Sequence, residues 1–271
     1  MSMTDKTIKD QLSSGVIEPV IELERANKIH YLPHHAVVRK DAKTTKVRVV
    51  YDASYKESPK DSSINDCLHV GPKLAPLLFH ILIRFRKKRV ALVADIEKAF
   101  LNIVVDTLDR DCLRFLWVDD VNSERVRPVE YRFCRVVFGV NCSPFLLNAT
   151  LQYHLDSFME VDREFVRKLR DSFYVDDLVS GDQSRKAAIM LYETASKQMA
   201  AGGFKLRKWF SNDESVLKEI ERREGSNLEG RKVDVVMKNV VDDQTYAKAS
   251  VGENSSSGSF EKVLGLGWVC K

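Results

Sequence analysis

Two adjacent aspartates between strand-forming residues are the strongest chemical signal in this sequence. Asp176 and Asp177 interrupt the run 173–179 at the place where a hairpin would turn. Asp95 stands in a matching setting, because it follows the apolar run 90–94. An ionised carboxylate in such a strand is costly to bury unless it meets a cation, and carboxylates set side by side repel one another. A bound divalent cation would remove both costs.

The ligand type indicates which metal and which chemistry. Carboxylate oxygens favour Mg²⁺ or Mn²⁺ over zinc, and two such ions can hold the attacking and leaving oxygens of an in-line phosphoryl displacement. A bare Asp-Asp pair is more often a solvated turn. The metal hypothesis therefore requires the fold to bring Asp95 beside Asp176.

Several motifs, in one order, resemble those of reverse transcriptases, and their wording is most similar to the BEL/Pao class of LTR retrotransposons. They are Y-V-D-D (174–177), D-I-E-K-A-F (95–100), Y-L-P-H-H-A-V (31–37), V-R-V-V-Y-D-A-S (47–54), S-I-N-D-C-L (63–68), R-F-L-W (114–117), G-V-N-C-S-P-F (139–145), G-F-K-L-R-K-W (203–209) and V-L-G-L-G-W (263–268). The resemblance covers nearly the whole chain. It implies an RNA- and DNA-directed DNA polymerase with an α+β fold, in which fingers and palm of a right-hand polymerase are interleaved in sequence.

Carried over residue by residue, the resemblance implies a two-metal site. Its ligands for two Mg²⁺ or Mn²⁺ ions would be Asp95, Asp176, Asp177 and the backbone carbonyl of Ile96. Lys208, in the motif at 203–209, matches the family's lysine that is proposed to protonate the departing pyrophosphate. Lys205, in the same motif, is the alternative candidate for that role.

The resemblance also implies a site for an incoming deoxynucleoside triphosphate. Phe100 falls where an aromatic ring beneath the sugar leaves no room for a 2′-hydroxyl. Arg48 falls where a guanidinium of the fingers holds the triphosphate, which suits the planar Arg fork. Either Arg39 or Lys40 matches the second cation of the fingers.

The chain differs from the retroviral pattern just before the motif at 139–145. Retroviral enzymes carry Gln there, whereas this chain has Phe138 followed by Gly139. Nucleotide contacts at this place would come from the Gly139 backbone or differ altogether.

The resemblance also divides the chain into regions. We expect residues 1–15 to be an N-terminal extension and 16–210 to be the interleaved fingers and palm. Residues 211–259 are expected to be a flexible connection, since they are charged, then Ser/Gly/Asn-rich, with weak periodicity. Residues 260–271 would begin the primer-grip hairpin, centred on Gly265, Leu266, Gly267 and Trp268. Thumb, connection and RNase H regions would lie outside this chain.

Local patterns predict the elements that position these residues. Strands are expected at 35–39, 46–51, 90–96, 113–118, 129–137 and 204–210, with a strand–turn–strand at 173–179. Helices are expected at 4–14, from Gly71-Pro72 to the cations 87–89, at 143–158 and at 184–201.

Composition limits the remaining possibilities. The 43 basic and 39 acidic residues give a net charge of +4, which does not oppose a nucleic-acid partner. Five cysteines without a C-x-x-C pair favour reduced thiols and an intracellular location. Basic clusters at 43–48, 84–89 and 163–170 could line a channel for an RNA or DNA template-primer. The other polyprotein domains (protease, integrase and those named above) are further expected partners, and no membrane partner is expected.

Two alternatives stay open. One is a catalytically inert, retroelement-derived remnant that binds nucleic acid. The other is an aspartic peptidase, which Pao polyproteins also encode. A peptidase needs an Asp-Ser/Thr-Gly turn, and Asp52-Ala53-Ser54 does not meet that pattern.

Overall fold

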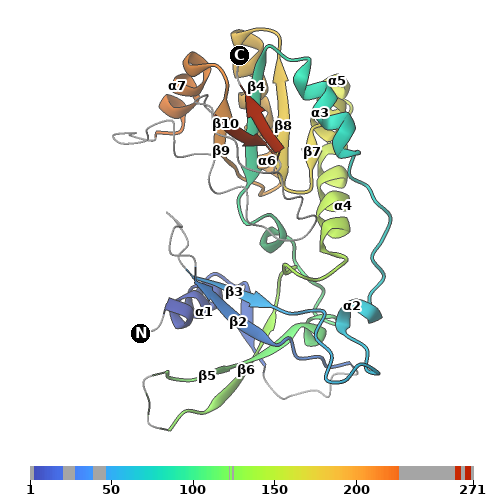
Figure 1. Cartoon of the computed structure of the whole chain (residues 1–271), viewed down its shortest axis with the longest axis vertical. Helices are drawn as coiled ribbons and strands as arrows, with labels where there is room; N and C mark the ends of the chain where they lie inside the picture. The colour runs from blue at the N-terminus through green and yellow to red at the C-terminus, as the bar shows by residue number, and fades with distance from the viewer. Residues whose placement is uncertain are drawn as a thin grey trace. The chain divides into compact units, whose positions relative to one another are not determined.

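The chain folds into two compact units, each built from two separate stretches of sequence (Figure 1). Unit 1 comprises Met1–Leu74 and Lys98–Tyr153, and unit 2 comprises Ala75–Glu97 and His154–Lys271. The computed structural model describes residues 3–20, 28–38, 47–121, 123, 125–225, 260–263 and 266–269. Helices and sheets are mixed in both units, and every pair of named strands is antiparallel.

Unit 1 contains two small sheets. The first has the order β1-β6-β5, formed by Ile17–Pro19, Pro128–Phe133 and Arg114–Val118. The second pairs β2 (His34–Val38) with β3 (Val47–Tyr51), close to the strands expected at 35–39 and 46–51. The helical elements are α1 (Met3–Ser13), α2 (Ile64–Cys67), the 3-10 turns η1 (Ala99–Asn102) and η2 (Arg110–Leu113), and α4 (Ser143–Asp156), whose last residues belong to unit 2.

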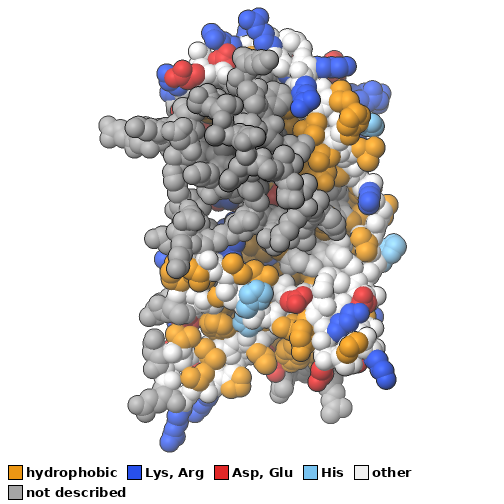
Figure 2. Space-filling view, in the orientation of Figure 1, with side chains coloured by type: hydrophobic (Ala, Val, Ile, Leu, Met, Phe, Trp, Pro, Cys, Tyr) orange, Lys and Arg blue, Asp and Glu red, His pale blue; other side chains and the backbone are white. Residues whose placement is uncertain are grey.

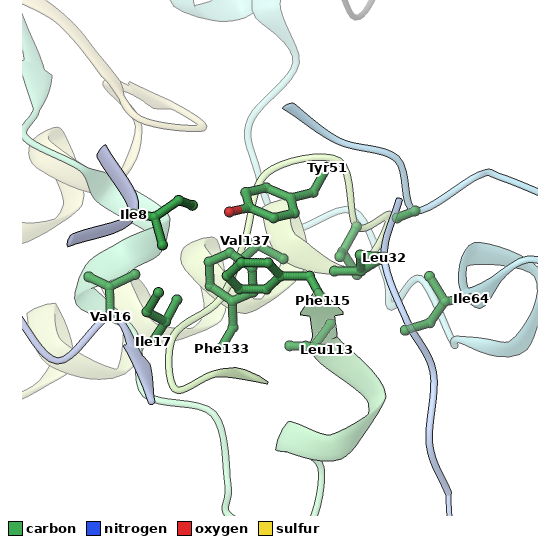
Figure 3. Packing of buried hydrophobic residues seen from close by; sticks show 12 residues of the cluster. Ile8, Val16, Ile17, Leu32, Tyr51, Ile64, Leu113, Phe115, Phe133 and Val137 are labelled. Carbon is green, nitrogen blue, oxygen red and sulfur yellow. The ribbon is translucent and has the colours of Figure 1, made fainter. Parts of the chain in front are cut away.

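Aromatic rings form the centre of the unit 1 core (Figure 3). Phe115 and Phe133 are fully buried, and Tyr51 packs edge-on against Phe133 with ring centroids 4.8 Å apart. Ile8 of α1 is 2% exposed and belongs to the same cluster. Helix α1, which falls in the expected N-terminal extension, thus contributes Ile8 to the unit 1 core.

Unit 2 is built on a four-stranded sheet with the order β7-β8-β4-β9. Its strands are Phe173–Tyr174, Asp177–Asp182, Val90–Ile96 and Leu206–Ser211. The helices are α3 (Leu78–Arg86), α5 (Arg163–Arg170), α6 (Arg185–Ala201) and α7 (Glu214–Arg223). A separate hairpin joins β10 (Phe260–Val263) to β11 (Leu266–Val269).

Both faces of the unit 2 sheet are covered. Ile81 and Phe85 of α3 pack against Ala91 and Val179. Because side chains alternate along a strand, residues 92, 94 and 96 of β4 point to the opposite face, where α6 packs on β4, β8 and β9. Asp95 shares its face with Ala91 at the end of the strand.

Most predicted elements are confirmed, including β4, the 173–179 hairpin, β9 and α6, which the structure shows to be capped by Ser184. The helix expected from Gly71 is wrong at its start, because α3 begins at Leu78. Pro76 explains the shift, since proline in a helix interior removes a hydrogen bond and clashes with the preceding turn.

The expected flexible connection over 211–259 is wrong in its first part. Ser211 ends β9, and α7 follows, with Asp213 accepting hydrogen bonds from the amides of Ser215 and Val216. Val216 and Ile220 are buried one helical turn apart, so α7 packs on α6 through an apolar stripe that the charged composition concealed. Residues 226–259 lie outside the described residues.

Within the described ranges, no helix is long and apolar enough to cross a membrane. Cys67, Cys112, Cys134 and Cys142 are free thiols.

Candidate active site

Strand pairing in unit 2 brings the sequence-predicted carboxylates together. Asp95 of β4 lies directly opposite Asp177 of β8, so the two side chains leave the same face of the sheet. Asp176 lies in the turn between β7 and β8, and its carbonyl accepts a hydrogen bond of 3.0 Å from the amide of Ile96. Asp95, Asp176 and Asp177 are all partly exposed. Strand pairing therefore places Asp95 opposite Asp177, with Asp176 in the adjoining turn, and their joint role as metal ligands stays a prediction.

The turn that carries Asp176 is strained. Tyr174 pairs with Asp177, which leaves Val175 and Asp176 as a two-residue loop. Val175 has φ +56°, a left-handed conformation that is unfavourable for a β-branched side chain. A positive φ at the first loop position is the pattern of a type II′ turn, where glycine is preferred. Such strain often accompanies functional sites.

A β-bulge in the edge strand β9 aims Lys208 at Asp95. The pairing of β4 with β9 shifts register between Val93 and Asp95, and Lys208 has φ +53°. Its Nζ lies 2.7 Å from Asp95 Oδ2. Lys205 Nζ instead lies 3.9 Å from Glu97 Oε2. Of the two predicted candidates, Lys208 is therefore the one that contacts the aspartates.

Arg207 is a member of this site that sequence reasoning missed. It lies opposite Asp95 in the pairing of β4 with β9, and its Nε is 3.6 Å from Asp95 Oδ1. Its Nη1 donates to Glu97 Oε1 at 3.1 Å. The signal was present in the sequence: acidic residues alternate at 95 and 97, and basic residues alternate at 205 and 207 on the paired strand.

The carboxylate oxygens of this site fit a divalent metal only in part. Asp95 Oδ1 is buried and accepts no hydrogen bond from the described residues, although Arg207 Nε lies 3.6 Å away, so a metal ion at this oxygen would take the place of Arg207. The oxygen-only donors suit Mg²⁺ or Mn²⁺. The described residues nevertheless contain no group of three or more His, Cys, Asp or Glu side chains already gathered as a metal site. Lys208 and Arg207 supply the positive charge around Asp95 instead.

The predicted nucleotide-binding residues belong to unit 1. Phe100 is 6% exposed, and its ring meets Phe138 edge-on with centroids 4.6 Å apart. Gly139 has φ +91°, and a Cβ there would lie 3.0 Å from the carbonyl oxygen of Tyr51. These three residues come together, whereas Arg48 is exposed on β3, paired with Val37.

Two further predictions concern the second cation of the fingers and the primer grip. Arg39, Lys40 and Gly265 lie outside the described residues. Leu266, Gly267 and Trp268 fall in β11, which pairs with β10 in the register Phe260 to Val269. The hairpin is present, and its role as a primer grip stays a prediction.

The hydrogen-bonded clamp around Gly139 was also missed. Asn65 Nδ2 donates to the carbonyl of Gly139 at 3.0 Å, and the Asn141 amide donates to Asn65 Oδ1 at 2.8 Å. The motifs at 63–68 and 139–145 thus serve partly to fix this loop.

Comparison with known proteins adds an independent observation. A search of curated proteins found no match. Residues 81–209, just under half of the chain, match a protein-family model, and they contain Asp95, Asp176, Asp177 and Lys208. The family that this stretch matches is described as reverse transcriptase (RNA-dependent DNA polymerase).

Proposed function

We propose that this chain is an RNA- and DNA-directed DNA polymerase domain, consisting of reverse-transcriptase fingers and palm, from a BEL/Pao-type retrotransposon polyprotein. The observation that carries the proposal is the pairing of Asp95 with Asp177, beside the strained turn of Asp176, inside the stretch that matches reverse transcriptases. Unit 2 would be the palm, and most of unit 1 the fingers.

The three aspartates would hold the metal ions of this reaction, together with the backbone carbonyl of Ile96. Two bound Mg²⁺ or Mn²⁺ ions would activate the primer 3′-oxygen and stabilise the charge that develops on the departing pyrophosphate. Asp95 Oδ1 supports this assignment, because it is a buried acceptor without a hydrogen bond. Lys208 would carry the proton that the pyrophosphate takes up, since its Nζ already reaches the carboxylate of Asp95.

Residues of unit 1 would select the nucleotide. Phe100 would exclude a 2′-hydroxyl, and its edge-on contact with Phe138 supports a rigid ring at that position. Arg48, with Arg39 or Lys40, would bind the triphosphate. The template-primer would be RNA or DNA, and further polyprotein domains would complete the enzyme in an intracellular particle or the nucleus.

A catalytically inert remnant that binds nucleic acid is the second candidate. The observation that favours it is the ion pairing of Asp95 with Lys208, together with the lack of a preformed three-carboxylate group among the described residues. Both candidates predict nucleic-acid binding, so only catalysis distinguishes them.

Primer extension on poly(rA)/oligo(dT) with Mg²⁺ and with Mn²⁺ tests the proposal. We expect the 271-residue chain to extend the primer, and Asp176→Asn to lower the rate by about a hundredfold or more. Asp171→Asn is the matched control, because Asp171 is an exposed aspartate at the C-terminal end of α5 in the same unit.

The outcomes separate the two candidates. Extension that depends on Asp176 and survives Asp171→Asn supports the polymerase. Template-primer binding without extension, with either metal, supports the inert remnant. Extension that survives Asp176→Asn contradicts the metal assignment.

A further inference from the structure

Three turns meet at the end of the unit 2 sheet where β4 begins. They are the turn from α3 to β4, the turn from β8 to α6 and the turn from β9 to α7. Asp95 lies near the other end of β4, five residues from Val90, which corresponds to about 16 Å along an extended strand. This end of unit 2 is therefore separate from the candidate active site.

Hydrogen bonds hold the three turns together. Gln183 Nε2, between β8 and α6, donates to the carbonyl of Lys87 at 2.9 Å. Asn212, between β9 and α7, accepts from the amide of Ala91 at 2.7 Å and donates to the carbonyl of Arg89 at 3.1 Å. The backbone that carries the surrounding cations is thus fixed by two amide side chains, which makes the surface preorganised.

These turns enclose a polar cleft with an excess of positive charge. Its volume is about 550 Å³, and its lining includes Arg89, Gln183, Arg185, Lys186, Asn212 and Asp213. Lys and Arg side chains gather over this end of unit 2, at the top of the view in Figure 2. The cleft is open to a charged ligand from solvent.

The acidic residues of the cleft are already neutralised. Asp213 accepts from Arg185 Nε at 2.7 Å, and neighbouring Asp182 pairs with Lys168 at 2.5 Å. Among the described residues, Lys87, Arg89 and Lys186 have no ion-pair partner. All three side chains belong to exposed residues, so three positive charges remain for an external anion.

We propose that Arg89 and Lys186, which line the cleft, and Lys87, an exposed residue of the adjoining α3–β4 turn, bind the phosphate backbone of a nucleic-acid strand as a second contact outside the reaction site. These three residues are termed here the basic cleft. The charges are spread over the α3–β4 turn and the start of helix α6 rather than focused on one point, which suits the repeated charges of a strand better than a single anion. Arginine and lysine donors on a fixed backbone can meet successive phosphates without ordering a loop. The inference extends the proposed function but does not depend on catalysis.

Binding of a fluorescein-labelled 20-base-pair RNA–DNA duplex, followed by anisotropy at several NaCl concentrations, tests the basic cleft. The test variant is Lys87→Ala/Arg89→Ala/Lys186→Ala in the 271-residue chain. The control is Lys6→Ala/Lys60→Ala/Lys197→Ala, which removes the same charge from exposed positions on α1, in the turn before α2 and on α6, outside the basic clusters. Circular dichroism and Tm confirm that both variants fold.

We expect the test variant to raise Kd by tenfold or more at 50 mM NaCl, and the control by less than about threefold. Loss of three phosphate contacts should flatten the slope of log Kd against log salt by about 2 to 3. An equal loss in both variants would mean that only net charge matters, and would overturn the proposal.

Two further arms keep the result specific. Polyglutamate of similar length serves as an acidic polypeptide, and a cleft-dependent loss of its binding without a loss of duplex binding would overturn the proposal. Primer extension is measured in parallel with Asp176→Asn. If duplex binding depends on the basic cleft but the chain does not extend primers, the result contradicts the polymerase and supports the basic cleft. If the chain extends primers but duplex binding does not depend on the basic cleft, the result supports the polymerase and overturns the basic cleft.

Discussion

Both units contain clusters of carboxylate and guanidinium groups, but the two clusters differ in how many of their polar atoms form hydrogen bonds. In unit 1, Asp111 accepts hydrogen bonds from Arg114 Nε at 2.9 Å and from Arg132 Nη1 at 3.0 Å. Glu18 accepts from Arg132 Nε at 2.7 Å. In unit 2, Asp95 has one short contact, with Lys208, while its Oδ1 and Arg207 Nε stay 3.6 Å apart without a hydrogen bond.

The pKa values reflect the closed network of unit 1. Burial raises the pKa of Asp111, but the hydrogen bonds from Arg132 and Arg114 more than compensate, so it lies below its usual value. Burial likewise raises the pKa of Glu18, and Arg132 reverses this shift. The unit 1 network therefore stabilises the fold by itself, whereas the carboxylate of unit 2 keeps an acceptor for a ligand and lies beside strained backbone. Both clusters are charged, so charge alone does not distinguish the candidate active site. Its distinguishing feature is that Asp95 Oδ1 and Arg207 Nε have no hydrogen-bond partner among the residues that the structure describes.

The largest expected effect is on activity in unit 2. Asp95→Asn keeps the size of the side chain but removes the charge that would hold metal, so primer extension should fall by about 10² to 10³-fold. Stability should change little, because the surrounding cations are partly exposed. Extension rate and Tm, measured on the same preparation, check both halves of this expectation. A fall in Tm as large as that caused by a destabilising substitution in the core would show that Asp95 is structural.

The mirror experiment in unit 1 should affect stability instead. Asp111→Asn leaves Arg114, whose side chain is 8% exposed, without its closest carboxylate contact. Breaking a mostly buried pair on one side typically costs about 2–4 kcal/mol. Urea unfolding of the parent and the variant measures the difference. Unchanged stability would mean that Glu130, which also pairs with Arg114, compensates for the loss.

The comparison also shows what could be predicted from sequence. Asp95 and Asp176 were predicted to meet because both end apolar strands; the strand pairing places Asp177 opposite Asp95, and Asp176 lies in the adjoining turn. Arg207 was missed because its partnership depends on the register between β4 and β9, which a bulge shifts by one residue. Lys208 was chosen by resemblance alone, whereas its actual approach to Asp95 requires a positive φ that no local pattern predicts.

The helices and strands show the same difference between local signals, which the sequence displays, and tertiary contacts, which it does not. Strand β4 and helix α6 were predicted within a residue, since the apolar run of β4 and the helical periodicity of α6 are local signals. Helix α7 was missed because its composition is charged and only two buried positions, Val216 and Ile220, reveal its packing. The role of α1 in the unit 1 core likewise depends on a tertiary contact of Ile8.

A substitution at Lys208 separates proton donation from metal binding. Lys208→Gln removes the proton donor and releases Asp95 Oδ2, so extension should slow by about tenfold to a hundredfold. Metal affinity should not weaken, because a competing cation has left the carboxylate. Single-turnover rates and Mn²⁺ titration separate these effects. Lys205→Gln is the control, since Lys205 approaches only Glu97. Weaker Mn²⁺ binding in Lys208→Gln would contradict competition for Asp95.

Acid should weaken the unit 1 network. The folded-state pKa values of Asp111 and Glu18 lie below their unfolded values, so their stabilisation is complete above about pH 5 and is lost as the pH falls through the folded values. Each titrating carboxylate changes stability by up to about 1.4 kcal/mol per pH unit. Tm between pH 3 and 7 measures the slope. Asp111→Asn should flatten it, and an unchanged slope would place the acid sensitivity elsewhere.

The smallest expected effect is on the turn that carries Asp176. Val175→Gly relieves a left-handed conformation that costs about 1–2 kcal/mol, but glycine loses more backbone entropy on folding, by about 0.5–1 kcal/mol. The two terms nearly cancel, so stability should change by less than about 1 kcal/mol. Extension should still slow several-fold, because a glycine turn holds Asp176 less rigidly. Val38→Gly is the control: Val38 is exposed in β2 without a positive φ, so it loses entropy and relieves no strain. A larger destabilisation at Val175 than at Val38 would show that the turn is not strained, and an unchanged extension rate would show that its strain does not serve the carboxylates.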